Sequence, residues 1–279
     1  PYQKKAGFET QLAMVSQLEL RPEDFRELAE HARTRGLAFL STPFDLSSLE
    51  FLVELGIPAL KISSGDLTYS ALLTAAAQAG RPVILSTGMA TLEEVSTAVD
   101  TLQNAGLKDL VLLQCTSLYP APEDTINLRA MNTLANVFQV PVGLSDHSLG
   151  IEVSLGAVAL GASVIEKHLT LDHNLKGPDH KASLEPHELS ALVSGVRRLE
   201  SALGSARKAP VSEEAAVRAV ARRSIVARHR ITKGSVIQPE DLAFKRPGHG
   251  ISPTMAEALL GRVARRTIEA DELVTWKDV

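Results

Sequence analysis

Short apolar runs alternate with amphipathic segments along roughly the first two hundred residues of the chain. Six runs are apolar on both faces rather than at alternate positions, which is typical of parallel strands that are covered on both sides. These predicted strands are residues 38–43, 59–63, 83–87, 110–115, 142–146 and 164–169. The segments between them have helical spacing, so the pattern predicts an α/β fold with a parallel sheet.

Turn and capping residues indicate where several of the intervening helices begin and end. Residues 47–50 (SSLE) and 91–94 (TLEE) have the spacing of a capping box, in which side chains and backbone amides cap one another. Pro22 suits the first position of a helix, because its missing N–H would have no partner there. Gly36 would end the same helix, because glycine readily adopts the left-handed conformation common at that point.

Polar residues gather where the predicted strands end: Thr42, Lys61, Ser63, Ser64, Ser86, Thr116, Ser145, His147 and His168. Polar groups at the carboxyl ends of six successive strands are typical of the active face of a (β/α)8 barrel. A doubly wound sheet would confine its site to one switch point, and no glycine-rich nucleotide-binding motif supports that option. Because a closed barrel needs eight strands, we expect a TIM barrel that lacks its first two βα units.

The pattern changes after about residue 202. Residues 203–218 are predicted to be a linker between the barrel domain, residues 1–202, and a small domain, residues 219–279. Within the small domain, residues 231–242 align without a gap to residues 268–279, each with a turn, two apolar residues and then an acidic one followed by an apolar one. This weak repeat predicts a compact, mostly β module with short turns.

Composition excludes several classes of protein. Apolar residues make up 44% and charged residues 22%, and the net charge of −4 is small, so nothing indicates binding to nucleic acid. No apolar run approaches the roughly 20 residues of a membrane span. Cys115 is the only cysteine, which excludes an internal disulfide and is compatible with a reducing cytoplasm.

Two histidines stand at the ends of successive predicted strands, His147 in Ser-Asp-His and His168 in Glu-Lys-His. Neighbouring strand ends would bring both within reach of one metal ion. A pair of hydrogen-bonded structural histidines has the same spacing. The sequence pattern leaves both interpretations open.

Lys61 lies late in an apolar strand and precedes Ser63-Ser64-Gly65. An unpaired buried ammonium is costly, so Lys61 requires a polar partner. A phosphate or carboxylate ligand would satisfy it, and the hydroxyls and the amide of the following turn suit an anion. Two other interpretations are an ion pair with Asp66 or Glu166 and a Schiff-base lysine.

Four further residues are candidates on weaker grounds. Ser86 precedes Thr-Gly and repeats the hydroxyl–glycine turn, which makes a second anion-binding turn plausible. Asp179 could serve as a general base or orient a sugar hydroxyl, although the loop taken alone favours a turn in which Asp179 caps the following segment. Cys115 is interpreted as a small core residue, because no base is visibly paired with it. Arg246, in a glycine-rich loop, could recognise a substrate or a partner chain.

Taken together, these residues resemble the bacterial sialic acid synthase family, whose C-terminal antifreeze-like (SAF) domain the small domain resembles. The motifs are long and cover nearly the whole chain. They are STPFD (41–45), KISSGDL (61–67), VILSTGMATLEEV (83–95), LLQCTSLYPAPEDTINLRAM (112–131), VGLSDHSLG (142–150), GASVIEKHLTLDHNLKGPDHKASLEPHEL (161–189) and KRPGHGI (245–251).

The resemblance implies roles for individual residues. His147 and His168 would bind a divalent ion, Mn²⁺ or, as substitutes, Mg²⁺ or Co²⁺. Phosphoenolpyruvate and the sugar would be bound by Thr42, Lys61, Ser64, Ser86, Ser117, Tyr119, Ser145, Asp179 and Arg246. The catalytic acidic groups would be Asp66, Glu166 and Asp179, with Asp66 at a position where the family often has Glu.

The resemblance also implies a reaction and an assembly. Phosphoenolpyruvate would condense with an N-acetylated amino sugar such as N-acetylmannosamine, giving a nine-carbon 2-keto acid such as N-acetylneuraminate and phosphate. Legionaminic or pseudaminic acid synthases share most of the motifs and are the alternative. Arg246 would reach the active site of a second subunit, which implies an intertwined homodimer.

Two interpretations from other classes remain open. A metal-dependent hydrolase on a barrel would use a metal-bound water and would cleave an amide or ester without phosphoenolpyruvate. A sugar- or partner-binding fragment would act through residues 219–279 alone, with no catalysis. An inactive fragment of a synthase is a third possibility, because the family has two further strands that carry another lysine and a glutamate.

Overall fold

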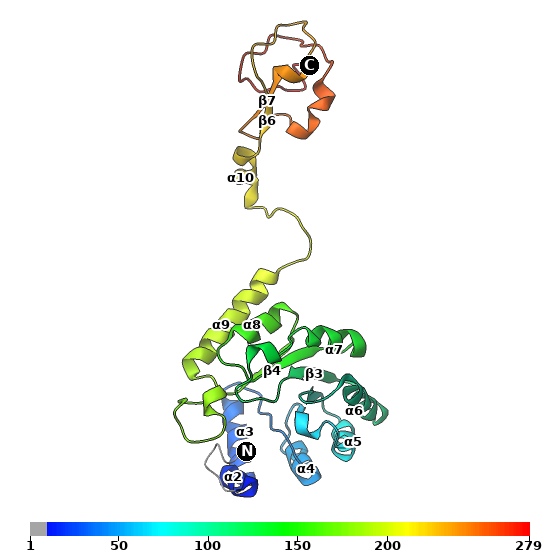
Figure 1. Cartoon of the computed structure of the whole chain (residues 1–279), viewed down its shortest axis with the longest axis vertical. Coiled ribbons are helices and arrows are strands. Elements are labelled where there is room, and N and C mark those ends of the chain that lie inside the picture. Colours follow the sequence, from blue (N-terminus) through cyan, green and yellow to red (C-terminus); the bar gives the residue numbers. More distant parts are fainter. Residues whose placement is uncertain (1–9) are drawn as a thin grey trace. The chain divides into compact units, whose positions relative to one another are not determined.

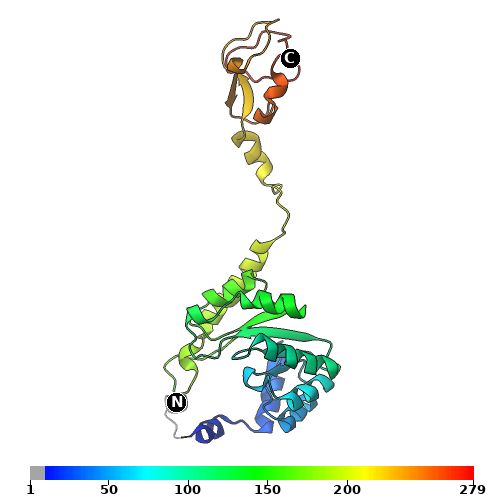
Figure 2. The same cartoon turned by 45° about the vertical axis from the view of Figure 1, so that its right-hand side comes forward.

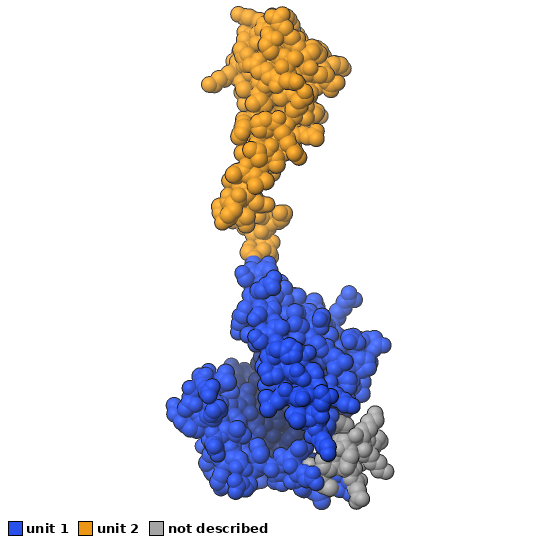
Figure 3. Space-filling model, turned by 90° about the vertical axis from the view of Figure 1, so that its left-hand side faces the viewer, with its two compact units in different colours: residues 1–204 blue, residues 205–279 orange. Residues whose placement is uncertain are grey.

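The computed structural model describes residues 10–279, and the chain divides into two compact units after Gly204 (Figure 3). The first unit is an α/β structure whose sheet contains only parallel strands in sequential order. Its strands are β1 (Leu60–Ile62), β2 (Val83–Ser86), β3 (Leu110–Cys115), β4 (Val142–Asp146) and β5 (Val164–Lys167). Its helices are α2 (Gln11–Leu18), α3 (Pro22–Thr34), α4 (Leu46–Glu54), α5 (Ser70–Gln78), α6 (Leu92–Asn104), α7 (Ala130–Phe138), α8 (Glu152–Ala159) and α9 (Pro186–Leu203).

The sheet is curled into an arc (Figure 1 and Figure 2). In a flat sheet, β1 and β5 would lie about 19 Å apart, because four spacings of about 4.8 Å separate them. The Lys61 Nζ on β1 nevertheless lies 3.4 Å from the Glu166 Oε2 on β5. Only a strongly curled sheet brings side chains of its two outermost strands together across the concave face, so the arc has the geometry of part of a barrel.

The core of the first unit lies between the convex face of the sheet and the helices. Ile62, Leu85 and Leu112 are neighbours in the ladder, and none of the three exposes measurable surface. Alternate residues of the same strands, such as Lys61 and Ser86, point to the concave face. The outer face of the strands is therefore mostly apolar, and the inner face carries several polar groups.

Two of the predicted features are wrong. Residues 38–43 form no strand, because in the described part of the chain no backbone ladder joins them to β1. The sheet accordingly has five strands rather than six. The predicted capping box at 47–50 is also wrong: α4 begins earlier, at Asp45, whose carboxylate accepts from Ser48 N at 2.7 Å. The box at Thr91 and Glu94 is confirmed, with both reciprocal bonds present.

The second unit contains α10 (Glu214–Ala221) and the antiparallel pair β6 (Ser224–Ala227) and β7 (Leu242–Lys245). The predicted repeat is visible in its backbone. Ile231 and Ile268, the first residues of the two copies, exchange reciprocal bonds of 2.9 Å. Asp241 and Asp278, which are equivalent in the repeat, each accept from the backbone amide three residues earlier, at 2.7 and 2.8 Å. The two copies therefore share one turn design.

Among the helices of residues 10–279, none is both long enough and apolar enough to cross a membrane.

Candidate functional site

Polar side chains meet on the concave face at the carboxyl ends of β3, β4 and β5. Cys115, Ser145 and Glu166 are in register across these strands and therefore point to the same side. Ser145 Oγ donates to Glu166 Oε1 at 2.6 Å, and the Lys61 ammonium lies 3.4 Å from the other carboxylate oxygen. The Glu166 carboxylate thus contacts both the Ser145 hydroxyl on the adjacent strand and the Lys61 ammonium on the strand at the other edge of the sheet.

The two predicted ligands lie one step further along the same face. His147 follows Ser145 by two residues and His168 follows Glu166 by two, and their ring centroids are 5.2 Å apart. The Tyr119 ring packs against both, at 4.2 Å from His147 and 5.5 Å from His168. The loop after β5 contributes Asp179, whose Oδ2 lies 3.9 Å from His168 Nδ1.

The hydrogen bonding of His147 suits a metal ligand. Its Nδ1 lies 2.9 Å from the carbonyl oxygen of Thr116, which can only accept, so Nδ1 carries the proton. The lone pair is then on Nε2, and a ring held in this way by a backbone carbonyl is the usual arrangement of a ligating histidine. In residues 10–279 no group of three or more His, Cys, Asp or Glu side chains is arranged to hold a metal. The two histidines are thus the potential metal ligands that this cluster offers.

Burial and neighbouring charges set the protonation states. Burial lowers the pKa of His168, and the charge of Asp179 opposes this only in part, so the imidazole is neutral at physiological pH. Burial also lowers the pKa of His147, but hydrogen bonds with Cys115 and Thr116 outweigh it and the net pKa is raised. Burial and then the surrounding negative charges raise the pKa of Tyr119 to about 12, so its phenol remains a donor.

Small hydroxyl groups line the concave face beside β1, β2 and β3. Ser64 Oγ accepts from the backbone amide of Gly88 at 2.9 Å. A Cβ on Gly88 would approach the Oγ of Ser64 to 2.8 Å and would meet Ser117 Oγ even more closely, so a larger residue here would displace both hydroxyls. The Ser86 hydroxyl, 2% exposed, has no hydrogen-bond partner in the described structure. A buried hydroxyl without a partner is a donor available to a ligand.

Among the described residues, no hydrogen bond or ion pair joins Asp66 or Thr42 to this cluster. Asp66 accepts from Ser63 Oγ at 2.5 Å and is the last residue of the short 3₁₀ turn after β1. Thr42 is half-buried in the irregular segment before α4. Arg246 is exposed on the loop after β7, in the second unit.

Sequence reasoning missed two features of the site. Cys115 is buried as expected, but its Sγ lies 4.0 Å from His147 Nδ1, a partner that only the fold reveals. Asp146 and Lys167 form a buried ion pair on the opposite face of the same strand ends. The alternation of side chains along β4 and β5 could have predicted this pair. It places Asp146 and Lys167 on the face opposite Ser145, His147, Glu166 and His168.

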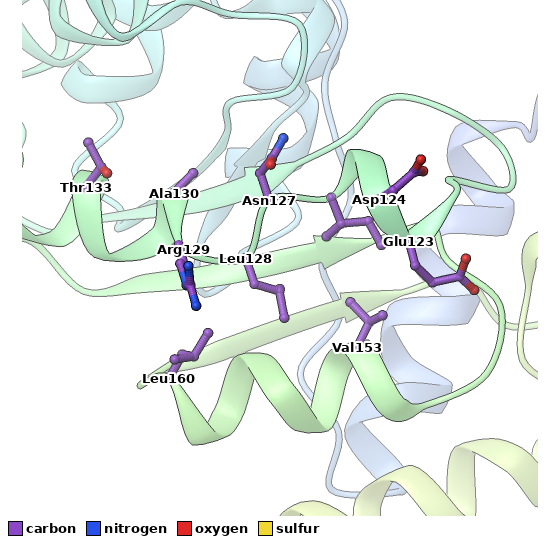
Figure 4. Close-up of a pocket in the computed structure, with 10 residues that line it drawn as sticks. Glu123, Asp124, Asn127, Leu128, Arg129, Ala130, Thr133, Val153 and Leu160 are labelled. Carbon is purple, nitrogen blue, oxygen red and sulfur yellow. The ribbon is translucent and has the colours of Figure 1, made fainter.

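A groove of about 790 Å³ lies elsewhere, on the outer surface between α7 and α8 (Figure 4). Glu123, Arg129 and Leu160 are among the residues that line it. None of the predicted site residues does so. The candidate site is therefore the concave cluster and not this groove.

Comparison with known proteins agrees with the motifs. The model of the NeuB family matches residues 1–208, and the model of the SAF domain matches residues 222–279. The N,N'-diacetyllegionaminic acid synthase of Campylobacter jejuni is 47% identical over 279 residues, which is 98% of this chain and 83% of the relative. The N-acetylneuraminate-9-phosphate synthase of Homo sapiens is 36% identical over 259 residues, 92% of this chain and 72% of the relative.

A solved structure is similar in fold as well. The N-acetylneuraminic acid (sialic acid) synthetase of Leptospira borgpetersenii serovar Hardjo-bovis, in complex with citrate, superimposes with a TM-score of 0.70 at 40% identity. The match covers 76% of this chain and 75% of that one. With the family model extending over more than half of the residues, the chain belongs to the NeuB family and carries a SAF domain at its C-terminal end.

Proposed function

We propose that the chain condenses phosphoenolpyruvate with an N-acetylated amino sugar, giving a nine-carbon 2-keto acid and phosphate. The observation that carries the proposal is the concave cluster, where a lysine, several hydroxyls, two histidines and two carboxylates converge. The proposal has chemical support in addition to the family membership. One side of the cluster has hydrogen-bond donors for an anion, and the other side has possible metal ligands beside a phenol and a carboxylate.

Phosphoenolpyruvate would be bound on the side of Lys61. The ammonium donates to the carbonyl of Ile62 and faces Glu166, and an ammonium has three donors. Its remaining proton, the Ser86 hydroxyl and the Ser64 turn can hold phosphate or carboxylate oxygens. These donors would stabilise charge on the phosphate as its bond to carbon 2 breaks.

The sugar would be bound on the side of the histidines. His147 and His168 would hold a divalent ion, Mn²⁺ or a substitute such as Mg²⁺ or Co²⁺. When bound, such an ion acts as a Lewis acid and orients a carbonyl oxygen. The Tyr119 phenol and the Asp179 carboxylate lie beside the same rings and would contact the sugar hydroxyls.

The reaction then divides between these two sides. Carbon 3 of phosphoenolpyruvate forms a bond with the aldehyde carbon of the open-chain sugar, whose oxygen takes a proton. Water adds at carbon 2, and Glu166, held by Ser145 and close to Lys61, is positioned to accept a proton from it. The bond between carbon 2 and the phosphate oxygen breaks, the hydroxyl on carbon 2 gives its proton to the departing phosphate, and the keto group and hydrogen phosphate result.

The test is phosphate release from phosphoenolpyruvate by the full chain with Mn²⁺, with and without chelator. N-acetylmannosamine would be compared with its relative that carries a second acetamido group, because legionaminic, pseudaminic and N-acetylneuraminate synthases are all compatible with the site. Chelator-sensitive release that requires one of the sugars is the expected result. Release that requires neither sugar nor metal, or hydrolysis of an amide without phosphoenolpyruvate, would overturn the proposal.

We further propose a homodimer in which Arg246 of one subunit serves the site of its partner. The support is the exposed guanidinium on a loop of the SAF-type unit. Arg246→Ala and Lys61→Met variants would each be nearly inactive. Mixed under conditions that allow subunit exchange, they should recover about a quarter of the parent activity, since half of the dimers would hold one intact site. No recovery, with exchange demonstrated, would argue that Arg246 does not act across subunits.

A further inference from the structure

A buried ion pair lies directly behind the two histidines. Asp146 is the last residue of β4 and Lys167 the last residue of β5, so each immediately precedes one of the histidines. Alternation along the strands turns both side chains to the convex face, away from the candidate site. The Lys167 ammonium lies 2.9 Å from Asp146 Oδ2, and the side chains are 3% and 0% exposed.

The Asp146 carboxylate is fully occupied by the protein. Its Oδ1 accepts from the backbone amide of Ser148 at 2.8 Å and from the Ser148 hydroxyl at 2.6 Å. Its Oδ2 accepts from Ser154 Oγ at 2.5 Å and from Lys167 Nζ. A carboxylate has about four acceptor positions, so none is left for a metal or a substrate. Asp146 is therefore neither a ligand nor a catalytic base, although it adjoins His147.

Lys167 connects the two segments that carry the histidines. Besides Asp146 it donates to the carbonyl oxygen of Ser148 at 2.6 Å, so it holds the residues on both sides of His147. The ladder between β4 and β5 ends at the pair of Asp146 and Lys167, and the histidines lie one residue beyond it. In the described sheet β5 pairs only with β4. Past the ladder, the Lys167 bond to Ser148 connects the two histidine segments, in addition to the Tyr119 ring that packs against both imidazoles.

We propose that Asp146, Lys167, Ser148 and Ser154 form a positioning network that fixes the separation and orientation of the His147 and His168 imidazoles. The inference rests on the proposed function in one respect only, namely that the fixed pair serves to hold a divalent ion. Asp146 and Lys167 act through the histidines and touch neither metal nor substrate.

A purely structural role makes a different prediction. A buried ion pair often adds little net stability compared with a neutral, well-packed replacement. If the pair served the fold alone, a neutral variant that folds normally would keep the geometry of the histidines. If it positions them, the same variant would fold but lose their fixed relation.

The decisive variant is the double substitution Asp146→Asn with Lys167→Met. The amide oxygen of the new side chain can still accept from Ser148 and its NH₂ can donate to Ser154, so no buried charge is left unpaired. Only the link to β5 is removed. Lys108→Met, on the exposed segment before β3, is the matched control for loss of a lysine.

Two measurements on the full chain test the proposal. In ¹⁵N-histidine spectra recorded without metal, the parent and the control should show single, sharp imidazole signals for His147 and His168. The double variant should show shifted, doubled or broadened signals, together with an altered ring-current shift from Tyr119. In a Mn²⁺ titration, the Kd of the double variant should rise about 10-fold relative to the parent.

The outcomes separate this inference from the proposed function. Unchanged imidazole spectra in a folded double variant would overturn the positioning role, whatever the metal does. Altered spectra with an unchanged Mn²⁺ Kd would overturn the link between the network and the metal. A parent chain that binds no Mn²⁺ would remove the metal from the proposed function, while the metal-free spectra still decide whether the network positions the histidines.

Discussion

Strand β5 contributes one residue to each of two lysine–carboxylate pairs, one pair on each of its faces. The pairs differ in how many of their hydrogen-bonding positions other protein groups occupy. On the convex side, the side chains of Asp146 and Lys167 are 0% and 3% exposed and lie 2.9 Å apart. On the concave side, Lys61 and Glu166 lie 3.4 Å apart, and the side chain of Glu166 is 39% exposed. The convex pair is closed to any ligand, whereas the concave pair retains both exposure and donors.

The difference follows from what surrounds each carboxylate. Asp146 has three neutral protein donors besides the lysine, while Glu166 has the Ser145 hydroxyl and otherwise faces the concave space. A closed pair can only hold backbone segments in place, because all of its hydrogen-bonding capacity is used. An open pair can exchange a partner for a ligand. Burial and the number of occupied hydrogen-bonding positions therefore distinguish the pair proposed to position the histidines from the pair proposed to bind substrate.

The largest expected effect comes from breaking the closed pair on one side only. Lys167→Met leaves a buried carboxylate without its cation and should lower the free energy of unfolding by about 3 kcal/mol. Urea denaturation at neutral pH measures it. Adding Asp146→Asn should restore the value to within about 1 kcal/mol of the parent, because no charge then remains unpaired. If both variants lose the same stability, the cost lies in packing and not in the buried charge.

Breaking the open pair should affect activity more than stability. In the proposed reaction Lys61 stabilises the developing phosphate charge, so we expect Lys61→Met to lower phosphate release about 100- to 1000-fold. Glu166 keeps its solvent exposure, so the unfolding free energy should change by less than about 1 kcal/mol. Steady-state kinetics and urea denaturation of one preparation check both values. A large loss of stability with retained activity would reverse the roles assigned to the two pairs.

Gly143 lies where β4 approaches β5 closely. It stands on the concave face of β4 opposite Val164, and a Cβ there would press on the Val164 carbonyl and approach a Leu113 methyl group to 2.8 Å. Gly143→Ala should therefore separate β4 from β5 and cost about 2 kcal/mol, again by urea denaturation. Gly156→Ala is the matched control, because its nearest contact is a Leu128 methyl group at 3.3 Å. Equal losses of unfolding free energy in the two variants would exclude an unusually close approach of β4 and β5 at Gly143.

Much of the first unit could be predicted from apolar runs. The predicted bounds of β3 and β4 agree with the structure, because both strands consist mainly of apolar residues and all of their residues are buried or half-buried. Residues 38–43 have the same composition but no ladder in the described sheet, and composition alone cannot supply a neighbour. The helix start at Asp45 was missed because serine at 47 fits the motif equally well, and only backbone geometry distinguishes the two positions.

The site was less predictable than the fold. Strand ends correctly indicated where polar groups gather, and the histidines do lie together. Which of Asp66 and Glu166 faces Lys61 could not be decided, because Glu166 reaches it only through the curl of the sheet. Ser154, eight residues beyond Asp146 and on α8, completes the buried network through tertiary packing that no local pattern encodes.

Asp45 is a third kind of carboxylate, satisfied by neutral donors without any cation. Hydrogen bonds from the Ser47 hydroxyl, at 2.6 Å, and then from the Ser48 amide lower its pKa to about 2. A pKa lowered by folding contributes stability above its unfolded value, near 3.8, and that contribution is lost as pH falls toward 2. Asp45 lies on the surface at the start of α4, so its effect should be the smallest of the series.

Asp45→Ala should cost about 1 kcal/mol of unfolding free energy at pH 7, the usual value for a lost helix N-cap. The difference from the parent should narrow as pH falls from about 4 toward 2, because protonation removes the same acceptor that the substitution removes. Urea midpoints of both proteins across this range test it, with Ser47→Ala expected to lose less than Asp45→Ala. If the difference in unfolding free energy did not change with pH, the cap would act through the shape of the side chain and not through its charge. The ranking of the three carboxylates by their hydrogen-bond donors would then not hold for Asp45.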